Sequence, residues 1–238
     1  MNFSLFICEL KIIFNFALQS TFNTINMDKQ NEHLETLSEI RSLMERSSRF
    51  ISLSGLSGVF AGIFALIGTI AAYIYLKIGI GSPGYYEYAI SENGEINTGF
   101  YIFFLTDAIC VLIASIAAGS ILTMRKAKQK GQPIWNTTAK RLLINLMIPL
   151  ITGGVFCLVL LYHGLVGLVA PATLIFYGLS LLNASKYTLE DIRYLGISEI
   201  MLGLIASIYI GYGLIFWALG FGILHIIYGI VMYKKYEQ

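Results

Sequence analysis

Long apolar runs alternate with short polar segments along most of this chain. The longest run, Ile197–Tyr233, has 37 residues and contains one acid, Glu199, one imidazole, His225, and no Lys, Arg, Asp or Pro. A single helix of that length would measure about 55 Å, whereas the hydrocarbon core of a bilayer is about 30 Å thick. The run therefore predicts two membrane-spanning helices joined by a tight turn. The candidate turn residues are three glycines, Gly211, Gly213 and Gly220.

The other apolar runs predict four more membrane-spanning helices. The fold expected is therefore an all-α integral membrane protein, a six-transmembrane-helix bundle. Its predicted spans are 51–76, 100–124, 142–162, 165–182, 197–213 and 216–233. Composition agrees, because 56% of the residues are hydrophobic and only 13% are charged. A soluble domain carries roughly twice that charged fraction.

The basic residues predict the orientation of the bundle. Clusters of Lys and Arg precede the first span, fill the second and fourth connectors and follow the last span, whereas the first outer loop has only Lys77. Positive residues remain on the cytoplasmic side, so we expect both termini in the cytoplasm. Short loops and the lack of a eukaryotic signal sequence favour a bacterial cytoplasmic (inner) membrane. The net charge of +2 is too small to predict a nucleic-acid partner.

The first 50 residues differ from the membrane domain predicted for 51–238. Residues 1–26 resemble neither a signal peptide nor a span, and we expect translation to start at Met27. The alternative is an interfacial helix lying on the membrane. Residues 27–50 predict a cytoplasmic amphipathic helix, with apolar side chains three and four residues apart within 31–48. That helix packs on its own bundle or on lipid, or it contacts a protein partner.

Two local motifs predict packing and turn geometry. Gly58 and Gly62 in the first span form a GxxxG pattern, which lets two membrane helices approach closely. In the first outer loop, Asn93-Gly94 between short alternating segments is typical of a hairpin turn. We therefore expect a small strand pair on the outer surface.

Ionisable groups inside a bilayer are costly and are candidates for function. The predicted spans contain three, Asp107, Glu199 and His225. Glu199 and His225 fall at similar depths on adjacent antiparallel helices, so they are expected to pair. Tyr209 or Tyr228 would lie nearby. The pair is either a hydrogen bond that holds helices together or a proton-sensitive site.

One motif resembles the active site of a known family. Gly55-Leu56-Ser57-Gly58 reads GxSG and His225 lies in the last span, which resembles the serine and histidine of rhomboid proteases. The resemblance would imply Ser57 as nucleophile with His225 as its base. It covers about five residues, and the serine stands on the first span where rhomboids place it on the fourth. No residues that would stabilise an oxyanion accompany it. We therefore expect no catalytic residues and no enzyme activity.

No cofactor or metal is expected. Cys8, Cys110 and Cys157 have no zinc or CxxC spacing, and no nucleotide-binding loop is present. We expect a non-enzymatic structural, sensory or accessory membrane component. Membrane lipid and a protein partner contacting residues 31–48 are its expected partners, and homo-oligomers remain open. The alternative is a small proton-coupled transporter or permease that uses Asp107, Glu199 and His225.

Overall fold

The computed structural model describes residues 40, 54–129, 131 and 135–237. The chain divides into two compact units, residues 1–48 and 49–238. Within the first unit only Ile40 is described, and it is helical and exposed. The expectations for residues 1–26 and the amphipathic segment 31–48 therefore lie outside the described residues.

The second unit is built from helices, and its described residues include no strand. The long helices are α2 (Gly55–Leu76), α3 (Thr98–Gln129), α4 (Thr137–Tyr162), α5 (Val169–Ala184) and α6 (Ile192–Ile208). The C-terminal rod consists of α7 (Gly213–Trp217), the π-helical segment η5 (Ala218–Leu224) and α8 (His225–Tyr236). In this part of the chain, five helical segments are long and apolar enough to cross a membrane. These are α2, α3, α4, Val166–Tyr187 and Ile210–Tyr236.

The long apolar run does turn back on itself. Helix α6 ends at Ile208, and a short 3-10 turn, η4 (Ile210–Tyr212), leads into α7. Of the three glycines predicted for this turn, Gly211 lies within it. Gly213 begins α7 and Gly220 lies inside η5.

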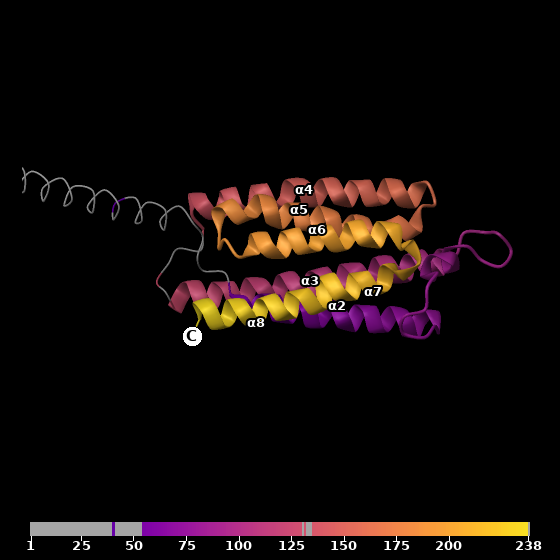
Figure 1. The fold of residues 1–238 in the computed structure, drawn as a ribbon, viewed down its shortest axis with the longest axis horizontal. Coiled ribbons are helices and arrows are strands. Elements are labelled where there is room, and N and C mark those ends of the chain that lie inside the picture. The colour runs from indigo at the N-terminus through magenta and orange to yellow at the C-terminus, as the bar shows by residue number, and fades with distance from the viewer. Residues whose placement is uncertain (1–39, 41–53, 130, 132–134, 238) are drawn as a thin grey trace, which may run out of the picture. The chain divides into compact units, whose positions relative to one another are not determined.

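The helices form two groups of three (Figure 1). Helix α5 lies between α4 and α6, and α2 packs against both α3 and α8. The two groups meet where α7 and η5 contact α5 and α6. Outward faces of α3 and α4 carry exposed apolar side chains such as Leu105, Ile113 and Ile151, as expected for surfaces in lipid.

Glycines allow a close contact between α2 and the C-terminal rod. A Cβ atom added at Gly62 would lie 2.6 Å from the Gly222 carbonyl oxygen, and one at Gly58 would lie 3.3 Å from Gly229 Cα. A Cβ at Gly229 would lie 2.6 Å from the backbone nitrogen of Val59. The GxxxG residues therefore face the C-terminal rod, and no larger residue fits at Gly62 without moving a backbone.

The predicted strand pair in the first connector is wrong. The Asn93-Gly94 turn forms, with Gly94 at a φ of 78°, but it closes a single isolated bridge between Ile90 and Ile96. A 3-10 helix, η1 (Tyr85–Ala89), precedes the bridge and α3 begins at Thr98, so no residues remain to extend the pairing.

Candidate functional site: a buried Glu-His-Tyr cluster and a separate cavity

Glu199 and His225 meet inside the bundle. Glu199 extends from α6 and is 0% exposed, and His225 begins α8 and is 5% exposed. His225 Nδ1 lies 3.3 Å from Glu199 Oε1. The structure therefore brings together two of the three ionisable residues predicted from the sequence.

A tyrosine and a backbone carbonyl complete the surroundings of His225. The Tyr177 hydroxyl, from α5, lies 2.8 Å from His225 Nε2, and the Gly220 carbonyl oxygen lies 2.9 Å from Nδ1. Because a carbonyl can only accept, Nδ1 carries a proton. In the neutral ring, Nε2 then accepts the hydrogen bond that Tyr177 donates.

The π-helical segment shapes this cluster. Gly220 lies within η5, five residues before His225, so the widened turn presents its carbonyl to the imidazole. A Cβ atom at Gly220 would lie 2.5 Å from Glu199 Oε2. The Glu199 carboxyl group therefore occupies space that a side chain at position 220 would fill. Such π-helical turns inside longer helices are frequent at functional sites.

The Glu199 carboxyl group has no hydrogen-bond partner on either oxygen among the described residues. A buried carboxyl group is costly without a polar neighbour, and among the described residues His225 lies within ion-pair distance of it, at 3.3 Å. The cluster, which we call the Glu199–His225–Tyr177 cluster, is thus an internal contact that joins α5, α6 and η5/α8.

Asp107 lies elsewhere. It extends from α3 toward α2, where a Cβ atom added at Gly68 would lie 3.0 Å from Asp107 Oδ2. It lines a partly open cavity of about 320 Å³ between α2, α3, α4, α5 and α7. Neither Glu199 nor His225 lines that cavity. The structure thus separates Asp107 from the other two residues.

The rhomboid-like serine does not meet the histidine. The Ser57 hydroxyl donates a hydrogen bond to the Ser54 carbonyl oxygen, one turn earlier. Both nitrogens of His225 are occupied by Tyr177 and Gly220. The described residues therefore do not contain the Ser-His hydrogen bond that a serine nucleophile needs.

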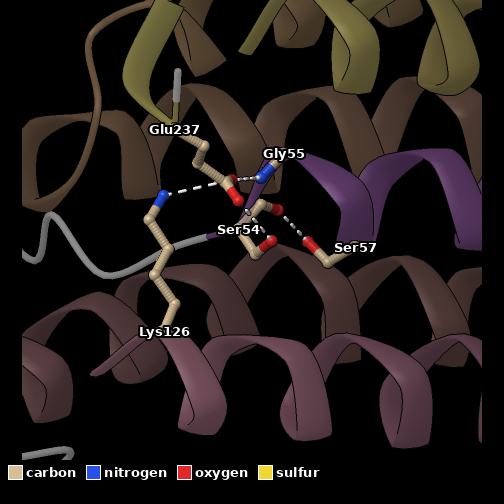
Figure 2. Close-up of polar contacts among 5 residues, drawn as sticks. All are labelled: Ser54, Gly55, Ser57, Lys126 and Glu237. Carbon is tan, nitrogen blue, oxygen red and sulfur yellow. Dashed lines mark hydrogen bonds and ion pairs between the residues drawn. The ribbon is translucent and has the colours of Figure 1, made fainter. Parts of the chain in front are cut away.

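A second polar cluster lies at the N-terminal end of α2. Figure 2 shows the Glu237 carboxylate between the first residues of α2 and Lys126 of α3. Its oxygens accept hydrogen bonds from the Gly55 backbone N–H, from Ser54 Oγ at 3.3 Å and from Lys126 Nζ at 3.1 Å. A carboxylate is favourable here because the N-terminus of a helix carries partial positive charge. These contacts join the C-terminus of α8 to α2 and α3.

A third contact lies near the same end of the bundle. Asp191, just before α6, accepts hydrogen bonds from Lys235 Nζ at 2.8 Å and from the Tyr236 hydroxyl at 2.7 Å. Partial burial raises the pKa of Asp191. The two hydrogen bonds and the charge of Lys235 together lower the pKa by more than burial raises it, so the pKa lies below its ordinary value. Asp191 is therefore held as a carboxylate that joins the start of α6 to the end of α8.

Sequence reasoning missed Tyr177, Glu237 and Gly220. It expected Tyr209 or Tyr228 near the cluster; Tyr209 is 56% exposed, and the Tyr228 hydroxyl has no hydrogen-bond partner among the described residues. Tyr177 stands beside Phe176 in an apolar span, and nothing in its spacing distinguishes it from Tyr228. Glu237 is an acid beside a basic terminus, which reads as a solvated residue until its neighbours are known.

Comparison with protein-family models, with curated proteins and with solved structures finds no match for this chain. Within the described ranges, no three His, Cys, Asp or Glu side chains gather as a metal site would require.

Proposed function

We propose that this chain is a six-span membrane protein of the structural, sensory or accessory class, acting through a protein partner. The observation that supports this most directly is the enclosure of Glu199 and His225, which contact each other and, through His225, Tyr177. Asp107 lies apart from them and lines a cavity that neither Glu199 nor His225 lines. A proton-coupled transporter would be favoured by two ionisable groups sharing one hydrated cavity, and this arrangement instead favours a structural role for the pair.

Six crossings are the topology that best accounts for the helices. Helix α6 has 17 residues and a length of about 26 Å, at the lower end of what spans a bilayer. Asp191 before α6 contacts Lys235 near the end of α8, so α6 and the C-terminal rod run antiparallel. Counting α6 as a crossing puts the start of α2 and the end of α8 on the same side of the membrane.

The distribution of basic residues supports an orientation with both termini in the cytoplasm. With the exception of Lys77, every described Lys and Arg lies in or beside the ends of helices that meet at the Glu237 end of the bundle. These residues are Arg125, Lys126, Lys128, Lys140, Arg141, Lys186, Arg193, Lys234 and Lys235. The positive-inside rule assigns that end to the cytoplasm, and we propose the bacterial cytoplasmic membrane. The predicted helix at 31–48 would then be available to a cytoplasmic partner.

Cysteine accessibility in membranes tests the proposal. Glu199→Cys and His225→Cys are made singly in a chain lacking Cys8, Cys110 and Cys157, and are treated with a membrane-impermeant maleimide from each side. Ala206→Cys, on α6 and 0% exposed, is the protected control, and Glu92→Cys in the exposed turn is the reactive control. Protection at both test positions is expected. Labelling at both would mean a hydrated path and would favour the transporter.

The partner is tested separately by deleting residues 31–48. We expect a co-purifying protein to be lost while thermal unfolding of the bundle stays unchanged. Retention of that protein would contradict a contact through this segment.

A further inference from the structure

The cavity around Asp107 combines an acid with aromatic walls. Rings of Tyr85, Phe100, Phe104 and Trp217 line it, with apolar side chains over most of the rest. Phe104 packs against Phe100 at 4.4 Å and against Tyr85 at 6.2 Å between ring centroids, so the aromatic wall is continuous across η1 and α3. The faces of such rings attract cations.

Asp107 has no partner in this cavity. No hydrogen bond or ion pair joins its carboxyl group to another described residue. The nearest hydroxyl groups do not supply one, because Thr69 donates to the Ala65 carbonyl at 3.0 Å and Thr173 donates to the Ala170 carbonyl at 2.7 Å. A carboxyl group in apolar surroundings is costly unless something pairs with it, so the cavity lacks one complementary group.

The cavity is accessible from the side of the bundle. Helix α3 packs on α2 and helix α4 packs on α5, and the cavity lies between these pairs. Leu105 of α3 and Leu158 of α4 both line it and are 58% and 62% exposed. In a membrane this opening would face the lipid, so an apolar molecule can reach the cavity through the bilayer.

We propose that this cavity binds a lipophilic organic cation, with its positively charged nitrogen at Asp107 and its apolar part among the aromatic rings. The acid supplies the charge that a cation requires, and the rings surround an ammonium group as they do in other ammonium-binding sites. The inference goes beyond the proposed function and does not depend on it, since it needs neither a partner nor the Glu199–His225–Tyr177 cluster.

Fluorescence of Trp217 gives a direct test. The chain has two tryptophans, and Trp135 is 63% exposed outside the cavity, so Trp135→Phe leaves Trp217 as the only reporter. The full chain in phosphatidylcholine nanodiscs is titrated with bromobenzyl-dodecyldimethylammonium or with neutral bromobenzyl dodecyl ether. Both probes bring a quenching bromine to the ring, and their concentrations in the bilayer are measured with protein-free nanodiscs. We expect the cation to reach half-quenching at a concentration roughly tenfold lower than the ether.

Three variants separate the contributions. Asp107→Asn keeps the size of the side chain and should abolish the preference for the cation while the ether titration is unchanged. Gly68→Ala places a Cβ 2.7 Å from Val111 Cγ2 and 3.0 Å from Asp107 Oδ2. It should weaken cation binding by displacing a carboxyl group that keeps its charge. Gly154→Leu projects into open space at the cavity lining and should reduce quenching by both probes.

The proposal has clear contrary outcomes. Equal quenching of Trp217 by the cation and the ether would mean that the cavity takes hydrocarbon alone. A preference for the cation that survives both Asp107→Asn and Gly68→Ala would place the charge recognition elsewhere. Either result overturns the assignment.

Discussion

Substitution of Gly62 by alanine should separate α2 from the C-terminal rod. The new Cβ would lie 2.6 Å from the Gly222 carbonyl oxygen, about 0.8 Å inside the 3.4 Å at which ordinary contact begins. It would also lie 2.6 Å from Ile226 Cγ1 and 3.1 Å from the Ile226 backbone nitrogen, so backbone groups as well as a side chain must move. Overpacking of this kind costs about 1–3 kcal/mol.

The matched control is Gly154→Ala on α4. Both positions are helical glycines, and each gains up to about 1 kcal/mol of helix propensity with alanine. At Gly154 the added Cβ meets nothing within 4 Å. At Gly58 it would lie 3.3 Å from Gly229 Cα, an intermediate case. The free energy of unfolding should therefore be highest for Gly154→Ala, intermediate for Gly58→Ala and lowest for Gly62→Ala.

Equilibrium unfolding in mixed micelles, titrated with SDS and followed by circular dichroism, measures this order. Gly62→Ala should unfold with a free energy about 1–3 kcal/mol below that of Gly154→Ala. Equal unfolding midpoints for the two variants would refute the close approach of α2 to the C-terminal rod.

Three further substitutions test the polar contacts. Tyr177→Phe should lower the free energy of unfolding by about 1 kcal/mol, whereas Tyr228→Phe, which removes an unpartnered hydroxyl, should not lower it; equal losses would contradict the cluster. Glu237→Gln should cost about 1–2 kcal/mol by weakening the contacts with α2 and Lys126, and an unchanged unfolding midpoint would argue against them. The lowered pKa of Asp191 stabilises the fold above its unfolded pKa of about 4, and this contribution is lost as the pH falls through the folded value. Asp191→Asn should therefore flatten the acid limb of a plot of unfolding midpoint against pH, and a limb as steep as in the wild type would exclude the linkage.

Several features of the fold were predictable because they depend on local chemistry. The 37-residue run from Ile197 is too long for one crossing, so a turn was required, and Gly211 lies in the turn observed. The absence of a strand pair at Asn93-Gly94 was not predictable in this way. The turn residues do form a turn, but η1 and α3 use the flanking residues that a ladder would need.

The candidate cluster likewise contains residues that were predictable from the sequence and residues that were not. Glu199 and His225 were predicted to pair because two polar groups at similar depth on adjacent helices need partners, and they lie 3.3 Å apart. Tyr177 was missed because it comes from α5, whose rotation relative to α8 depends on packing. Gly220 was missed because its carbonyl reaches His225 only through the π-helical turn of η5.

By itself, the sequence determined that this protein has apolar helices long enough for a membrane, with Glu199 and His225 inside one apolar run. Hydropathy and charge are properties of individual residues and of their spacing, so they can be read without knowing the neighbours. Only the tertiary structure decided that Tyr177 completes the cluster, that Glu237 contacts the N-terminus of α2, and that Asp107 lines a separate aromatic cavity. Those contacts join residues far apart in the chain, and they depend on how each helix is rotated about its axis when side chains pack.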